Sequence, residues 1–186
     1  MTPRSMVLAL SWGTLSITPL PSNMLPPQLL PVYGGSDGTA FSRDCGSGKV
    51  LTGLRYRAGL LVDALGLLCR PVSSSRTLGP ESTVGTLVGG GGGSSGSVSC
   101  ASGTVVTGAL IYHGSLVNGV QLTCRVWGAA SRQFVVPSAS VLGRFGGGAP
   151  ATPTGEACEA TTQPASGFRG RAGLVVDAIG FVCDEP

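Results

Sequence analysis

The sequence has 186 residues, a length that suits one domain with a sizeable core. It contains 31 glycines and only 11% charged residues, a mixture that predicts short strands and tight turns and argues against a helical protein. The net charge is +3, and the 12 basic residues are scattered without a run, which argues against a nucleic-acid partner.

Residues 1–31 form an N-terminal extension that does not fit the rest of the chain. Met1–Met6 carry one arginine and Val7–Ile17 are mildly apolar, which resembles a poor signal peptide. The apolar run is too short and too polar to span a membrane. Pro19–Pro31 is rich in proline and is expected to be extended. An upstream extension without a role explains the same residues equally well.

Residues 32–186 are predicted to form one domain built from three copies of one unit. Gly53–Cys69 and Gly167–Cys183 are identical at 11 of 17 positions, and Gly108–Cys124 keeps the spacing of its Gly, Gly, Asn and Cys. A period of about 50 to 60 residues indicates one supersecondary unit used three times. We expect copies at about 32–83, 84–140 and 141–186.

In the first copy, a turn at Tyr33-Gly34-Gly35 precedes expected strands around Ala40–Arg43, Lys49–Arg57 and Leu61–Val72. Each copy is expected to supply about four strands in this way. Three sheets of four strands can bury their apolar faces against a common axis, which gives a three-sided prism.

The strands that open the later copies are expected at Val84–Val88, before the five glycines Gly89–Gly93, and at Val141–Phe145, before Gly146-Gly147. In the third copy, Pro164 interrupts the second strand, which should therefore be shorter or at a sheet edge.

Alternation along the third strand of each copy identifies the inward face. Val120, Leu122 and Cys124 alternate with Gly119, Gln121 and Thr123, and period two places alternate side chains on one face. The same register in the other copies predicts the following inward residues: Leu65, Leu67, Cys69, Ile179, Phe181 and Cys183.

Six cysteines fall two to a copy, at separations of 24, 24 and 25 residues. Short Cys-x-x-Cys pairs are absent and the chain has a single histidine, so zinc is not indicated and no metal or cofactor is expected. We predict three disulfides, Cys45–Cys69, Cys100–Cys124 and Cys158–Cys183, and a secreted protein. Buried free thiols in a cytosolic protein are the alternative.

The Gly-Gly pairs and the segment Gly167–Phe181, GFRGRAGLVVDAIGF, resemble the jacalin-related lectins. The paired cysteines look more like those of the related vitelline membrane outer layer protein. The resemblance covers residues 32–186. It implies an all-β fold, the type I β-prism, with three four-stranded Greek-key sheets and internal pseudo-threefold symmetry.

The resemblance also implies sugar sites, in which a Gly-x-x-x-Asp loop faces a Gly-Gly loop from the next sheet. The aspartate would accept hydrogen bonds from sugar hydroxyls, and glycine would let the ring approach the backbone. Asn118 lacks the charge, so its copy should be weak. The carbohydrate-binding residues would be Gly173, Leu174, Val175 and Asp177 with Gly34 and Gly35; Gly59, Leu60, Leu61 and Asp63 with Gly90 and Gly91; and, weakly, Gly114 and Asn118 with Gly147.

Glycans are thus the expected partners, of mannose/glucose or galactose type, and homo-oligomer formation stays open. The alternative is a structural or coat β-prism without a sugar site, in which Asp63 and Asp177 only hold turns by bonding to local backbone.

No enzyme is predicted. An acyl-transfer triad would have to use His113, which aligns with Ala58 and Ala172 and is expected to be an ordinary strand residue. Gly46–Val50 lacks the first glycine and the Ser or Thr of a phosphate loop.

Overall fold

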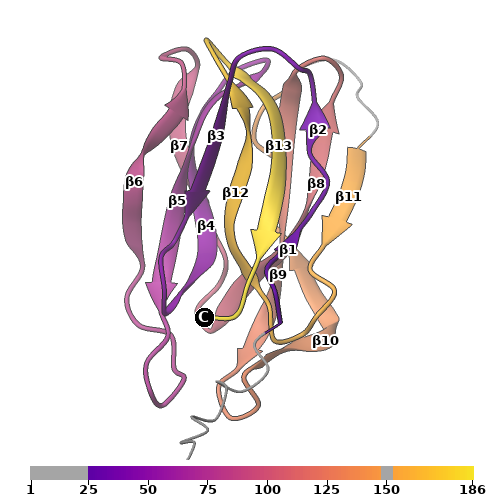
Figure 1. The fold of residues 1–186 in the computed structure, drawn as a ribbon. Helices are drawn as coiled ribbons and strands as arrows, with labels where there is room; N and C mark the ends of the chain where they lie inside the picture. Colours follow the sequence, from indigo (N-terminus) through magenta and orange to yellow (C-terminus); the bar gives the residue numbers. More distant parts are fainter. Residues whose placement is uncertain (1–24, 148–152) are drawn as a thin grey trace, which may run out of the picture.

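The computed structural model describes residues 25–147 and 153–186, without the side chains of Pro137 and Ser138. The suggested leader and the first part of the proline-rich segment lie outside the described residues. The described chain is built from strands and contains no helix (Figure 1). In the same residues no segment could cross a membrane as a helix.

Three antiparallel sheets wrap around one core (Figure 1). Sheet I has the order β1-β13-β12-β3, with β2 also paired to β13; sheet II has the order β6-β5-β4-β7; and sheet III has the order β10-β9-β8-β11. In sheets II and III the fourth strand returns beside the first, as in a Greek key. The strands are β1 Gln28–Leu29, β2 Tyr33–Gly34, β3 Thr39–Asp44, β4 Lys49–Ala58, β5 Val62–Pro71, β6 Ser82–Gly89, β7 Ser94–Ser99, β8 Thr104–His113, β9 Val117–Gly128, β10 Gln133–Val141, β11 Pro153–Ala157, β12 Ala165–Ala172 and β13 Val176–Cys183.

The prism predicted from the sequence is confirmed, with differences in detail. Sheet I has five strands because its outer strand is split into β1 and β2. The strand expected at Val141–Phe145 lies earlier, as β10, because β10 pairs with the long end of β9; only Phe145 adds a single bridge, to Val120. β12 is indeed shorter than β4 and β8, but it lies between β13 and β3, since Pro164 precedes the strand instead of interrupting it.

The core consists of the inward faces of all three sheets. Every residue predicted to point inward on β5, β9 and β13 is at most 1% exposed. Phe168 and Phe181 fill the interior of sheet I with ring centroids 6.5 Å apart, and Phe41 packs edge-on against Phe168. Alternation therefore located the core correctly.

A bulge recurs at the same place in the three central hairpins. Thr52, Thr107 and Ser166 are each skipped in the pairing register. Their carbonyls accept hydrogen bonds from the N–H groups of Cys100, Cys158 and Cys45. The following glycine of each copy packs directly under a neighbouring carbonyl, so a Cβ there would clash; these glycines are Gly53, Gly108 and Gly167.

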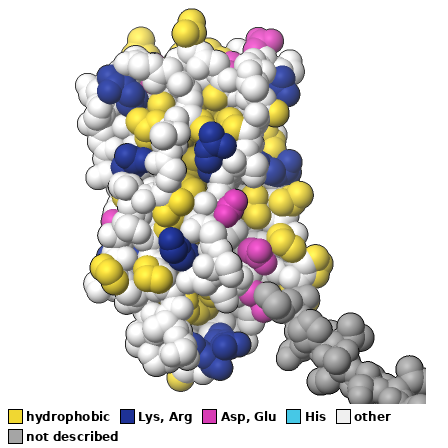
Figure 2. Space-filling view, turned by 60° about the vertical axis from the view of Figure 1, so that its left-hand side comes forward, with side chains coloured by type: hydrophobic (Ala, Val, Ile, Leu, Met, Phe, Trp, Pro, Cys, Tyr) yellow, Lys and Arg dark blue, Asp and Glu magenta, His cyan; other side chains and the backbone are white. Residues whose placement is uncertain are grey.

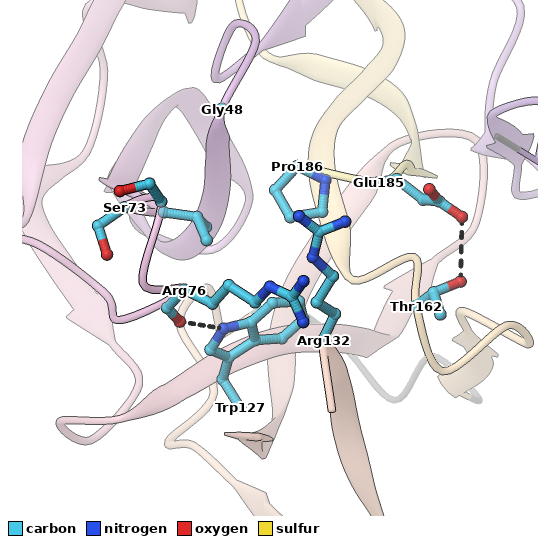
Figure 3. Close-up of a pocket in the computed structure, with 10 residues that line it drawn as sticks. Gly48, Ser73, Arg76, Trp127, Arg132, Thr162, Glu185 and Pro186 are labelled. Carbon is cyan, nitrogen blue, oxygen red and sulfur yellow. Dashed lines mark hydrogen bonds between the residues drawn. The ribbon is translucent and has the colours of Figure 1, made fainter. Parts of the chain in front are cut away.

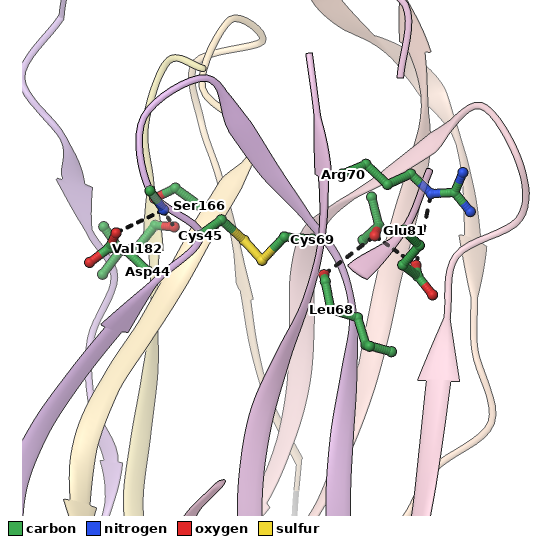
Figure 4. Close-up of a disulfide and its surroundings, with 10 residues drawn as sticks. Asp44, Cys45, Leu68, Cys69, Arg70, Glu81, Ser166 and Val182 are labelled. Atoms are coloured by element: carbon green, nitrogen blue, oxygen red, sulfur yellow. Dashed lines mark hydrogen bonds and ion pairs between the residues drawn. A yellow bond between two sulfur atoms is a disulfide. The ribbon is translucent and has the colours of Figure 1, made fainter. Parts of the chain in front are cut away.

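All three predicted disulfides are present, and each joins two different sheets. Cys45, after β3 of sheet I, bonds to Cys69 on β5 of sheet II (Figure 4). The other two link sheet II to sheet III and sheet III to sheet I, as Cys100–Cys124 and Cys158–Cys183. The three seams of the prism are therefore crosslinked in a cycle.

The surface carries few charges, and they are dispersed. On the face shown in Figure 2, lysine and arginine side chains are separated by neutral surface. This distribution agrees with the scattered basic residues of the sequence.

Candidate functional site

Three loops with the same conformation meet at one end of the prism, away from the last residues of the chain (Figure 1). They connect β4 to β5, β8 to β9 and β12 to β13. In each, the N–H of the glycine donates to the carbonyl two residues on, at 2.9 to 3.0 Å: Gly59 to Leu61, Gly114 to Leu116 and Gly173 to Val175. The repeated Gly-x-x-x-Asp/Asn spacing thus corresponds to one repeated loop.

The acid-bearing copies each lie against the glycine pair that the sequence assigned to them. Gly35 donates its N–H to the carbonyl of Asp177 at 2.9 Å, and Gly90 donates to that of Asp63 at the same distance. Each glycine pair lies in or beside a strand of the same sheet as its aspartate, since β2 pairs with β13 and β6 with β5. The expectation that the Gly-Gly loop comes from the next sheet is wrong, because the two segments are antiparallel neighbours.

A loop from a neighbouring sheet also packs against each of these glycine pairs. Gly35 packs against the carbonyl of Ser115 in the β8–β9 loop, and Gly90 packs against that of Leu174 in the β12–β13 loop. A Cβ at Gly147 would lie 3.6 Å from the carbonyl of Gly59. Each glycine pair therefore lies between its own sheet's loop and the loop of a neighbouring sheet, and the contacts run around the prism.

The two carboxylates differ in exposure. Asp177 is only 6% exposed, and its Oδ2 is buried without a hydrogen-bond partner among the described residues. That oxygen faces Gly38, where a Cβ would clash with it. Asp63 is half-buried and faces Gly92 and Gly93 in the same way. Both carboxylates thus pack closely against a glycine loop in which any larger side chain would clash with them.

Two arginines that the sequence analysis did not single out hold these glycine loops. Arg57 donates to the carbonyls of Gly92 and Gly93 at 2.7 and 2.8 Å. Arg171 donates to the carbonyls of Asp37 and Gly38 at 2.8 and 2.7 Å. Aligning the copies could have found them, because arginine stands two residues before the loop glycine in both copies that have Asp.

The second copy, residues 84–140, differs at both positions. Tyr112 replaces the arginine and Asn118 replaces the aspartate. The Tyr112 ring lies under the guanidinium carbon of Arg144, 3.8 Å from the ring centroid. The backbone of Asn118 still packs against Gly146. This copy keeps the loop and lacks both charged groups.

The tips of the loops are apolar. Leu60 is 77% exposed and Leu174 is 88% exposed, whereas Leu61 and Val175 are half-buried. These side chains offer nonpolar contact beside the aspartates.

His113 makes structural contacts. Its Nε2 lies 3.0 Å from Thr154 Oγ1, and its ring packs against Tyr33 at a centroid distance of 5.2 Å. Among the described residues, no three His, Cys, Asp or Glu side chains come together as a metal site would require.

No family model matches the chain, and no curated protein matches it in sequence. Similar solved structures do exist. Malaysian banana lectin is 20% identical with a TM-score of 0.60, covering 87% of this chain and 100% of that one. A mannose-binding jacalin-related lectin from Ananas comosus is 22% identical with a TM-score of 0.59, covering 86% and 99%.

A third solved structure is similar to the same extent. The agglutinin of Calystegia sepium is 18% identical with a TM-score of 0.60, covering 88% of this chain and 100% of that one. At such identities the likeness concerns the fold, and the cysteine resemblance to vitelline membrane outer layer protein stays a prediction. The chain has the fold of the jacalin-related lectins, the type I β-prism.

Proposed function

We propose that this protein binds carbohydrate and does so without catalysis. The proposed site is the loop end of the prism, with Asp63 and Asp177 as acceptors for sugar hydroxyls. The lectin from Ananas comosus is described as mannose-binding, and a Calystegia lectin has been solved with a bisected glycan. These neighbours support a glycan ligand, while the choice between mannose/glucose and galactose types stays open.

One observation carries the proposal: arginine and aspartate occur together in the first and third copies and are both missing from the second. In the first and third copies, Arg57 and Arg171 fix the glycine loop that the carboxylate faces. A fixed loop offers backbone N–H groups at constant positions, and a carboxylate accepts charge-assisted hydrogen bonds. The backbone hydrogen bond that closes the loop is present in all three copies, with Asn118 in place of aspartate in the second, so the turn does not require a carboxylate.

The extracellular space is the compartment that fits the proposal. Three disulfides crosslink the sheets, and such bonds persist in oxidising environments. The dissociation constant for a monosaccharide at one site should be about millimolar, a binding free energy of about 4 kcal/mol. Two sites on one molecule would therefore raise the avidity for a multivalent glycan.

A glycan array followed by titration calorimetry tests the proposal. We expect Asp63→Asn and Asp177→Asn to weaken binding at least about tenfold, equivalent to about 1.4 kcal/mol, through loss of charge-assisted hydrogen bonds. Asn118→Ala in the loop of the second copy is the matched control and should leave affinity unchanged. Absence of binding to every glycan, or binding that survives the double aspartate variant, would refute the sugar site.

A structural β-prism without a sugar site is the second candidate, and the burial of Asp177 favours it for that copy. With 6% exposure, this carboxylate presents little surface to a ligand. Asp63 is more accessible, so we expect it to carry the larger share of binding. Loss of thermal stability in Asp177→Asn without any loss of affinity would assign Asp177 to the fold alone.

A further inference from the structure

A cavity of about 230 Å³ lies beside the last residues of the chain, at the end of the prism opposite the candidate sugar loops (Figures 1 and 3). All three sheets contribute to it. Ser73 and Arg76 come from the β5–β6 loop, Arg132 from the β9–β10 turn, and Thr162 and Glu185 from the segments flanking β12 and β13. A cavity of this size can hold a small organic molecule.

The backbone of this cavity is strained at its two arginines. Arg76 and Arg132 have φ of 66° and 56°, and they are the two non-glycine residues with positive φ in the described part of the chain. Side chains other than Gly, Asn and Asp adopt this conformation rarely, and such strain concentrates at ligand-binding sites.

Surrounding hydrogen bonds keep both arginines in this conformation. Arg76 N–H donates to Ser73 O at 2.7 Å, and Arg132 N–H donates to Gly128 O at 2.9 Å. The buried indole of Trp127 donates from Nε1 to the carbonyl of Arg76 at 3.0 Å. Arg76 Nη1 in turn donates to Ala130 O at 3.3 Å, which ties the two arginine-bearing segments together.

Both guanidinium groups retain donors for a ligand. Arg132 is exposed, and within residues 25–147 and 153–186 its guanidinium has no hydrogen-bond acceptor. Neither arginine forms an ion pair with a described carboxylate, and Glu185 instead accepts from Thr162 Oγ1 at 3.3 Å. Figure 3 shows both arginine side chains extending into the cavity beside the indole of Trp127.

From this arrangement we propose a second binding site, specific for a small organic oxoanion that carries a carboxylate, sulfate or phosphate. The forked donors of a guanidinium match the paired oxygens of such groups. Val72, Trp127 and Pro186 supply apolar contact for the body of the ligand. The site shares no residue with the proposed sugar loops, so it does not depend on lectin activity.

Tryptophan fluorescence provides the test. The chain has two tryptophans, so a Trp12→Phe background leaves Trp127 as the only indole. Titration with glucuronate should give a saturable change with a dissociation constant of about a millimolar or lower, weakened by added salt. Glucose, which has the same ring without the carboxylate, should give none. If inorganic sulfate displaces glucuronate, the charged group supplies most of the affinity. If sulfate does not displace it, the body of the ligand contributes as well. Both results agree with the proposal.

Arg132→Asn separates binding from folding, because Asn tolerates positive φ well. The variant should keep or raise the melting temperature and weaken glucuronate binding at least about fivefold. Arg43→Gln removes one positive charge elsewhere and should not change it, and Asp63→Asn with Asp177→Asn should also leave it intact. An equal response to glucose, an unchanged response in Arg132→Asn, or no response to glucuronate would overturn the proposal.

Discussion

At the residue scale, Arg57 occurs with Asp63 and Arg171 with Asp177, whereas the second copy keeps only the loop. The arginines act through backbone carbonyls of the glycine loops and not through the aspartates. Arginine suits this role because its rigid fork can satisfy two carbonyls at once. They are positioning residues in the proposed site.

Arg57→Gln should therefore loosen the glycine loop that faces Asp63. Loss of hydrogen bonds from a charged donor should lower stability by about 1 to 2 kcal/mol, and sugar affinity should fall with it. Amide hydrogen exchange at Gly92 and Gly93 should accelerate. Tyr112→Phe, at the equivalent place in the second copy, is the control; unchanged exchange in Arg57→Gln would argue against positioning.

Glu156 is a titratable residue away from either site. It lies on β11 of sheet III, and its Oε1 accepts from the N–H of Phe181 on β13 of sheet I at 3.0 Å. Desolvation by burial raises the pKa of Glu156 from 4.5 to about 7, although the Phe181 N–H and the nearby Arg169 act in the opposite direction. Its Oε2 is buried and has no partner among the described residues.

Stability should consequently fall as the pH rises from about 4.5 to about 7. In that window the folded state binds more protons than the unfolded state, so ionisation of Glu156 penalises folding by up to about 2 to 3 kcal/mol. Urea unfolding at pH 5 and pH 7.5 measures this difference. Glu156→Gln should remove most of it, and a variant with the wild-type pH dependence would contradict the assignment.

At the scale of elements, the bulged hairpin explains the first glycine of the repeated motif. Gly53, Gly108 and Gly167 each follow the bulge and lie under a carbonyl of the neighbouring strand. The carbonyl of the bulge residue then binds the N–H of a half-cystine. The motif therefore encodes an attachment point between strands as well as a loop.

Gly53→Ala should be strongly destabilising, because the added Cβ would clash with the carbonyl of Val98. We expect a loss of at least about 2 kcal/mol in chemical unfolding. Gly143→Ala is the control, since a Cβ at Gly143 meets no heavy atom within 4 Å. Equal stabilities of the two variants would show that the strand spacing adapts.

Alternation and the threefold motif were sufficient to predict the sheets, the inward faces and the disulfides. β10 was misplaced because Val141–Phe145 looks like a strand locally, whereas the pairing with β9 begins at Gln133 and shifts register midway. The arginines at 57 and 171 were missed because their partners are backbone carbonyls, so that only an alignment of the copies, and no chemical motif, singles them out. The cavity beside Trp127 was missed because it is assembled from loops that lie far apart in the chain.

At the scale of the whole molecule, the three disulfides tie the sheets to one another at the seams of the prism. Each closes a segment of similar length, with separations of 24, 24 and 25 residues. Removing one by a double Cys→Ala substitution should lower stability by about 3 kcal/mol in the chain-entropy model. The three losses should be similar when measured by guanidinium unfolding, and a much smaller loss for one pair would show that its seam is held by packing.

The pairing of early with late strands in sheet I affects folding during biosynthesis. Its strands β1, β2 and β3 pair with β12 and β13, and Arg171 bonds to Asp37 across 134 positions of sequence. During translation, β1, β2 and β3 lack their hydrogen-bonding partners until the hairpin of β12 and β13 has left the ribosome. A nascent chain arrested before β12 would therefore expose β3 along its whole length, which makes it a substrate for chaperones until translation is complete.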